Sequence, residues 1–158
     1  MPIFERHTLT STTEIATRPE KVWDFFLNLE DNYKRWHPEE HEYWRWKKGN
    51  PLEIGAKIDS LEIVDGHKSR IRAVVVDSIE NEKIGLKPNW PISIMCPKLE
   101  WIIEDKGDKV DFIAKTYYKF GKIFRTLNKN AASEIMDLTQ KHMDEEGENL
   151  KRILESTG

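Results

Sequence analysis

Two residues with metal-binding side chains, His142 and Glu146, stand four positions apart in a segment that predicts a long helix. Each helical residue advances by about 100°, so with Ile135 at zero His142 falls at about −20° and Glu146 at about +20°. Ile153 returns to about 0°, which places the polar pair in the middle of the apolar stripe that faces the core. An imidazole and a carboxylate one turn apart can converge on one metal ion, or they can simply hydrogen-bond each other.

A metal ion needs further ligands, and an aromatic-rich segment over residues 33–46 offers two histidines. His37 and His41 lie on either side of Pro38. If the chain is helical after Pro38, His41 can turn inward, whereas His37, directly before the proline, is expected to be extended. Each of them could equally be a partly buried histidine bonded to the backbone. The sequence therefore leaves open which of the two would bind a metal.

A carboxylate ligand is expected from a predicted β-hairpin over residues 56–64 and 69–77. Its turn is Asp65-Gly66, a dipeptide that favours the positive φ angles of a two-residue hairpin turn. Glu62 lies in the first of these strands and is the candidate. Because side chains alternate between the two faces of a strand, the pattern alone does not say whether Glu62 faces inward.

Other kinds of chemistry find little support in the sequence. The chain has one cysteine, Cys96, which excludes an internal disulfide and a thiolate-rich zinc site. We expect Cys96 to be a small core residue and not a nucleophile. The chain contains no G-x-S-x-G, P-loop or G-x-G-x-x-G motif, so hydrolase-elbow, nucleotide and dinucleotide chemistry have no motif to support them.

Length and composition indicate one domain over residues 1–158, with a net charge of −3. This charge argues against a nucleic-acid or anionic-membrane binder. No apolar run approaches the roughly 18–20 residues of a membrane span, and the first residues show no signal pattern, so we expect a cytoplasmic protein. Six Trp, six Phe and four Tyr are a heavy aromatic load for a chain in which 34% of the residues are charged. Such aromatics suit a core with a ligand pocket.

The elements that must position these residues are a first strand, a short helical region, a series of strands and a long last helix. This order predicts an α+β domain in which the C-terminal helix lies across a curved antiparallel sheet and leaves a cavity between them. Besides the hairpin, the expected elements are a strand over residues 8–17, a helix that begins at Pro19, strands over 82–87, 97–104 and 109–119, and a helix over 133–155.

With this order of elements, the chain resembles the helix-grip proteins of the START/SRPBCC superfamily. Three motifs are similar, more narrowly, to the diacetylphloroglucinol hydrolase family: YKRWHPEEH at 33–41, LEIVDG at 61–66 and KHMDEEGENL at 141–150. That family uses a His/Glu/His/Glu zinc site in a helix-grip cavity to cleave a carbon–carbon bond of an acylphloroglucinol. The chain is shorter than the characterised enzyme and compact between residues 78 and 97, so the resemblance does not extend to the substrate.

By position, the resemblance implies a zinc site made of His142, Glu146, Glu62 and one histidine, either His41, which we favour, or His37. Tyr33 would lie beside the cavity as a partner for a substrate hydroxyl or as a proton donor. These residues support a metal-dependent hydrolase that cleaves a carbon–carbon bond of a small acylated aromatic or β-diketone-like compound with metal-activated water.

Two other functions are compatible with the sequence. In the first alternative the protein is a non-catalytic carrier of a small hydrophobic or aromatic molecule, and the His/Glu pair only orients a polar end of the ligand. In the second, which has the least support, Trp44 and Trp46 are exposed to a protein partner. Neither nucleic acid nor a membrane span is expected in any of the three cases.

Overall fold

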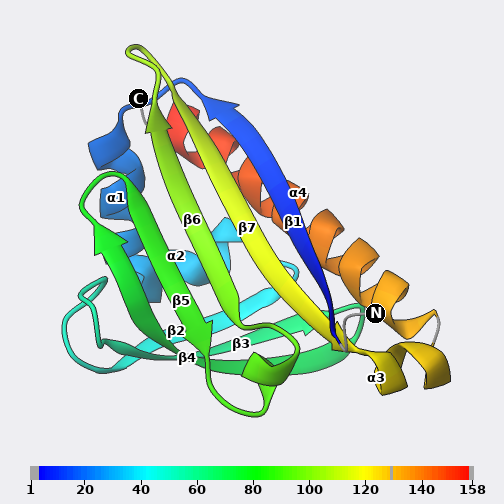
Figure 1. Cartoon of the computed structure of the whole chain (residues 1–158). Coiled ribbons are helices and arrows are strands. Elements are labelled where there is room, and N and C mark those ends of the chain that lie inside the picture. The colour runs from blue at the N-terminus through cyan, green and yellow to red at the C-terminus, as the bar shows by residue number, and fades with distance from the viewer. Residues whose placement is uncertain (1–3, 129, 157–158) are drawn as a thin grey trace.

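A seven-stranded antiparallel sheet curves around the long C-terminal helix in the computed structural model, which describes residues 4–128 and 130–156 (Figure 1). The strand order is β1-β7-β6-β5-β4-β3-β2, so the first two strands of the chain form opposite edges of the sheet. The elements are β1 (Phe4–Ile15), α1 (Pro19–Leu27), α2 (Leu29–Trp36), β2 (His41–Lys48), β3 (Lys57–Val64), β4 (His67–Ile79), β5 (Lys83–Pro88), the 3₁₀ helix η1 (Ile92–Ile94), β6 (Lys98–Asp105), β7 (Val110–Gly121), α3 (Lys122–Leu127) and α4 (Ala131–Ser156).

The predicted hairpin and the long helix are confirmed. Val64 pairs with His67, and the two turn residues Asp65 and Gly66 have φ angles of 52° and 77°, as a primed two-residue turn requires. Pro19 is the first residue of α1, where its missing N–H leaves no hydrogen bond unmade. The α+β class expected from the order of elements is therefore the class observed.

The segment around Pro38 differs from the expectation, because no helix continues after the proline. Helix α2 ends at Trp36, the next residues form a turn, and His41 is already the first residue of β2. The turn is closed by the backbone N–H of His41, which donates to the carbonyl of His37 at 2.8 Å. The β-favouring aromatic residues after His41 then pair with β3 instead of forming a helix.

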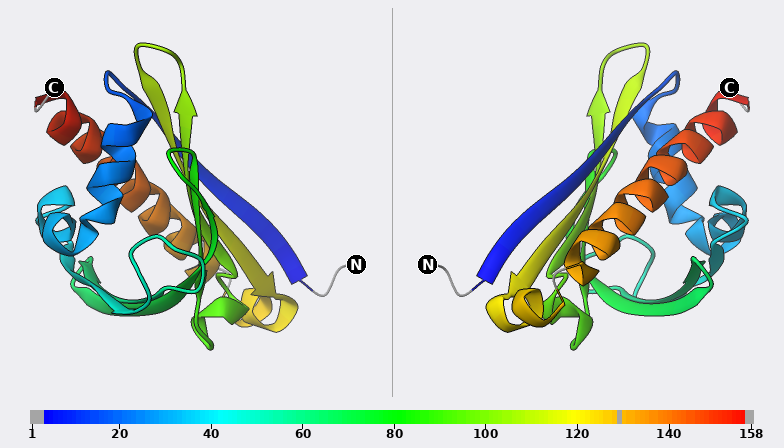
Figure 2. Two further views of the ribbon diagram at one scale, coloured as in Figure 1. Left: turned by 90° about the vertical axis from the view of Figure 1, so that its left-hand side faces the viewer. Right: turned by 90° about the vertical axis from the view of Figure 1, so that its right-hand side faces the viewer.

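The core lies between the sheet and helices α1, α2 and α4, which cover the same face of it (Figure 2). Phe26 of α1 stacks on Trp101 of β6 with ring centroids 4.7 Å apart, and the fully buried Trp36 packs against both rings. Trp44 is only 6% exposed and Trp46 packs against the core, so the hypothesis that these two rings are exposed to a protein partner is wrong.

Helix α4 packs most closely against β1. Apart from Ala132, its buried side chains begin at His142, and Leu138, about one turn earlier, is 38% exposed. Gly147 meets Thr13 of β1, and Ser11 of β1 donates to Asp144 at 2.6 Å. None of the helices in the described residues combines the length and the apolar character that crossing a membrane requires.

Candidate metal centre

Four of the predicted site residues come together where strands β2 and β3, at one edge of the sheet, meet the middle of α4. His41 begins β2 and pairs in register with Glu62 of β3, so these two strands bring an imidazole and a carboxylate to the same place. His142 and Glu146 project from one face of α4 toward them, as the helical phase predicts. All four residues are largely or fully buried, and the hairpin face that carries Glu62 is the inner one.

The donor atoms of these residues converge. Nε2 of His41 and Nε2 of His142 are 3.3 Å apart. Nε2 of His41 lies 3.1 Å from Glu146 and 3.8 Å from Glu62. Nε2 of His142 lies 3.5 Å from each of the same two carboxylates. Two imidazole nitrogens and two carboxylates thus surround one small volume.

Tyr33 of α2 orients two members of this group at once. Its carbonyl accepts a hydrogen bond from Nδ1 of His41 at 2.9 Å, which leaves Nε2 of that ring directed at the cluster. Its hydroxyl donates to Glu62 at 2.6 Å, and its ring stacks on His41 with centroids 3.8 Å apart. Burial, and next the negative charges of Glu62 and Glu146, raise the pKa of the Tyr33 hydroxyl well above 10, so it remains a proton donor at neutral pH.

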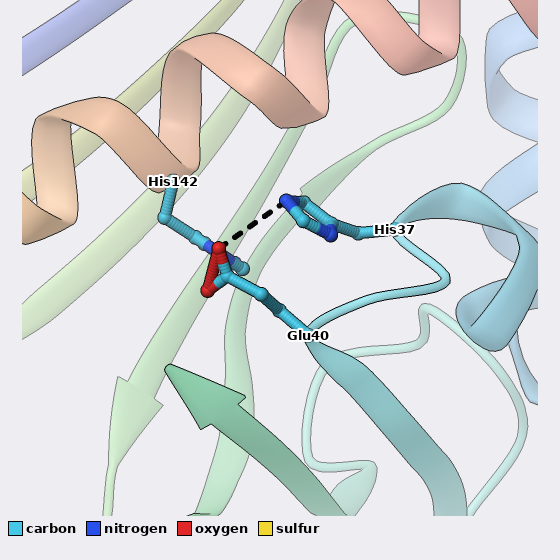
Figure 3. A group of neighbouring side chains, drawn as sticks. All are labelled: His37, Glu40 and His142. Carbon is cyan, nitrogen blue, oxygen red and sulfur yellow. Dashed lines mark hydrogen bonds and ion pairs between the residues drawn. The ribbon is translucent and has the colours of Figure 1, made fainter. Parts of the chain in front are cut away.

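His37 lies next to this cluster but is not part of it. Its Nε2 is 2.7 Å from Glu145 and 3.4 Å from Glu40. Figure 3 shows the second of these contacts beside His142. A groove of about 780 Å³ opens there between α4 and the turn after α2, and His37 and Glu145 are among its lining residues. The structure therefore separates the two histidines that the sequence could not distinguish: His41 faces the convergent donor atoms and His37 faces the groove.

The charges of the cluster stabilise one another. Burial alone would lower the pKa of His142, but the carboxylates of Glu146 and Glu62 outweigh it and raise the pKa to about 12. Burial alone would raise the pKa of Glu146, but His142 and then His41 outweigh it and hold the pKa well below the usual range. Without a metal ion, His142 is therefore an imidazolium that pairs with buried carboxylates.

The unfolding free energy of the metal-free protein is predicted to depend on pH through this pair. The raised pKa of His142 stabilises the fold fully below the unfolded value of 6.5, and this contribution falls as the pH rises toward about 12. The lowered pKa of Glu146 stabilises the fold above the unfolded value of 4.5 and is lost in acid. In urea unfolding with a chelator present, we expect a loss of up to about 1.4 kcal/mol per pH unit above about pH 7. His142→Gln should remove that slope, and an unchanged slope would contradict the prediction.

Tyr33→Phe is predicted to destabilise the fold by about 1–3 kcal/mol, because the largely buried Glu62 loses the hydroxyl that donates to it while the ring and the backbone carbonyl stay in place. Urea unfolding measures the difference. Tyr43→Phe is the matched control, since that hydroxyl makes a weaker contact of 3.4 Å with Asp59 and the residue is only half-buried. Equal midpoints for Tyr33→Phe and the wild type would show that the hydroxyl contributes nothing.

Two features of the site could not be predicted from the sequence. Glu40 lies 3.2 Å from Nδ1 of His142, yet no sequence pattern distinguishes it from the neighbouring Glu39, because only the fold of the turn decides which one points inward. The double contact of Tyr33 was missed because a backbone carbonyl has no sequence signature. Cys96 behaves as expected: it is buried, and burial raises the pKa of its thiol to about 11, which keeps it protonated.

The curved antiparallel sheet and the long C-terminal helix define the class, which is the helix-grip fold. The chain belongs to the polyketide cyclase/dehydrase and lipid transport family, whose model matches residues 6–155. A search of curated proteins gave no match.

Solved structures agree with this fold at low sequence identity. The protein TTHA0849 from Thermus thermophilus has a TM-score of 0.74 and 15% identity, over 96% of this chain and 99% of that one. A START superfamily protein from Mycobacterium smegmatis has a TM-score of 0.71 and 16% identity, over 96% and 99%. The di-domain ARO/CYC BexL from the BE-7585A biosynthetic pathway has a TM-score of 0.77 and 12% identity, over 95% of this chain and 50% of that one.

Proposed function

We propose that the protein binds one divalent metal ion through His41, Glu62, His142 and Glu146. The observation that carries this proposal is that the Nε2 atoms of His41 and His142 lie 3.3 Å apart. In each ring the other nitrogen, Nδ1, faces a hydrogen-bond acceptor outside the cluster. Two nitrogens bound at about 2.0–2.1 Å in a tetrahedral arrangement are about 3.3 Å apart. The carboxylate distances of 3.1–3.8 Å are of the same size.

Charge supports the same proposal. Two carboxylates and two neutral imidazoles carry a charge of −2 in a largely buried place, and a dication balances it without any proton. Imidazole and carboxylate together suit zinc, and they also accept other first-row dications. The metal would replace the proton that His142 otherwise holds.

The proposed ligand is His41 and not His37, because of where each ring can carry its proton. Nδ1 of His41 donates to the Tyr33 carbonyl, so its Nε2 has a free lone pair. Nδ1 of His37 is buried with no partner among the described residues, so its proton is best placed on Nε2, where two carboxylates accept it. A metal on Nε2 of His37 would leave a buried N–H unsatisfied, at a cost of about 1–3 kcal/mol.

For the reaction, we propose hydrolysis of a carbon–carbon bond between an acyl group and an electron-rich ring or β-diketone carbon. Water adds to the acyl carbon, the bond to the ring breaks with its electron pair, and the ring carbon takes a proton, so that a carboxylic acid and the deacylated ring result. A bound dication would supply an acidified water and polarise the carbonyl. Tyr33 keeps its proton at neutral pH and is the candidate donor to the ring carbon. The support is the resemblance of the three motifs to the diacetylphloroglucinol hydrolase family.

Metal content and turnover test the two parts separately. Untagged protein purified without chelator is analysed for metal and then reloaded with zinc, manganese or cobalt. We expect one equivalent in the wild type and none in His142→Ala, with the exposed His67→Ala as the matched control. A wild type that cannot be loaded refutes the metal site. Loaded protein that releases no carboxylic acid from any of a panel of acylated polyhydroxybenzenes and β-diketones refutes the reaction and leaves the metal site standing.

Ligand binding without bond cleavage is the second candidate. It is supported by the family description, which combines cyclases and dehydrases with lipid transport, and by the likeness to an ARO/CYC protein. A thermal-shift screen distinguishes it: stabilisation by aromatic polyketide-like compounds in the presence of chelator, without any stabilisation by zinc, would favour a carrier or a cyclase over the metal-dependent hydrolase.

A further inference from the structure

Behind His142, a second set of polar side chains lies outside the proposed ligand set. Oε2 of Glu40 is 3.2 Å from Nδ1 of His142, and Oε1 of the same carboxylate is 3.4 Å from Nε2 of His37. Figure 3 shows these three side chains pointing toward one another, two from the turn between α2 and β2 and one from α4. The rings of His37 and His142 are nearly parallel, with centroids 5.1 Å apart. This carboxylate therefore bridges the two rings, with one oxygen near a nitrogen of each.

We infer that Glu40 is a positioning residue for the metal centre: it accepts the Nδ1 proton of His142 and so directs the Nε2 lone pair of that ring toward His41, Glu62 and Glu146. The inference rests on the proposed metal binding. A histidine that binds a metal through one nitrogen needs an acceptor at the other, and a carboxylate there fixes the ring and makes it a stronger ligand. For His41 this acceptor is a backbone carbonyl, which no substitution of a side chain can remove. For His142 it is a side chain and can be tested.

The position of Glu40 is fixed on both sides. Its carbonyl accepts from the backbone N–H of Ile63 in β3 at 2.7 Å, and its own N–H donates to the carbonyl of His37 at 3.1 Å. The carboxylate faces Nε2–H of His37, whose other close partner is Glu145 at 2.7 Å. His37 thus acts as a donor that holds Glu40 in place, and its burial is explained without assigning it to the metal.

Zinc affinity, measured by competition with a chromogenic chelator, tests the inference in Glu40→Ala, Glu40→Gln and the exposed neighbour Glu39→Ala. We expect affinity to fall by about 10–100-fold in Glu40→Ala and to stay unchanged in Glu39→Ala. Glu40→Gln should recover most of the loss, because its amide oxygen can still accept the Nδ1 proton. The visible spectrum of the cobalt-loaded protein should change in Glu40→Ala only, since the ring of His142 is then free to turn. Thermal unfolding of the metal-free variants checks that each one folds.

Three results would overturn the inference, and they are distinguishable. Wild-type zinc affinity and an unchanged cobalt spectrum in Glu40→Ala would show that the carboxylate does not position His142, with metal binding itself intact. A second equivalent of zinc that is lost in both Glu40→Ala and His37→Ala would make these residues ligands of their own site. A wild-type protein that takes up neither zinc nor cobalt would overturn the proposed function, and this inference with it.

Discussion

Glu146→Gln is expected to lower the zinc affinity of the protein by at least about 100-fold, whereas Glu145→Gln is expected to leave it within about threefold of the wild type. The two substitutions make the same chemical change at adjacent positions of α4. Glu146 is buried, and its Oε2 lies 3.1 Å from Nε2 of His41. Glu145 is partly exposed, and its carboxylate contacts His37 at the groove. Removal of one buried negative charge leaves the charge of a dication only partly balanced. The loss of zinc affinity should therefore exceed the loss caused by substitution of a residue that contacts only a ligand and not the metal.

Isothermal titration with zinc after chelator treatment measures this difference. Glu146→Gln keeps the shape of the side chain, and the unfolding midpoint of the metal-free variant shows whether the helix still packs. If both glutamine variants bind zinc like the wild type, the cluster is not the binding site. If Glu145→Gln loses the affinity and Glu146→Gln does not, the metal is bound on the groove side of His142, and the ligand set would have to be reassigned.

Gly147→Ala is expected to destabilise the protein by about 1–3 kcal/mol, although alanine is the better helix former by about 1 kcal/mol. A Cβ at this position would lie 2.2 Å from Oγ1 and 3.3 Å from Cβ of Thr13 in β1. Both residues are buried, so neither the helix nor the strand can give way without loss of packing. Each kcal/mol should lower the Tm by about 2–4 °C.

A double-mutant cycle with Thr13→Ala makes this prediction specific. Removal of the threonine hydroxyl and methyl group takes away atoms that the new Cβ would meet. The double variant should therefore lose less unfolding free energy than the two single variants lose together. Glu148→Ala, at the exposed next position of the same helix, is the control for a change in α4 as such. A Gly147→Ala protein more stable than the wild type would show that the helix and β1 are not in close contact there.

How much of the site could be predicted depended on the kind of element that carries each residue. For His142 and Glu146 a single helix sets the geometry, and the advance of about 100° per residue is sufficient to place both on the face of the helix that is turned toward the core. For Glu62 the hairpin could be predicted from its turn, but not which face is inner, because that depends on what packs against the sheet.

The residues before β2 were the hardest to place, since their positions depend on a turn and not on a regular element. A helix after Pro38 would turn His41 inward; His41 does face inward, but as the first residue of a strand. The same turn decides that Glu40 meets His142 while Glu39 remains exposed. Local sequence predicts that His37, directly before Pro38, is extended, but the strand that begins at His41 is fixed only by pairing with β3, about 20 positions along the chain.

The strand order has a mechanical consequence for this region. Strands β1 and β2 are the two free edges of the sheet, and α4 touches both: Gly147 contacts Thr13 on β1, and His142 contacts His41 on β2. The curvature of the sheet therefore brings its two edges to the same part of α4, at contacts that lie only five positions apart on the helix. Because both contacts lie on one helix, a change that holds β2 more firmly against α4 also limits how far β1 can move away from it.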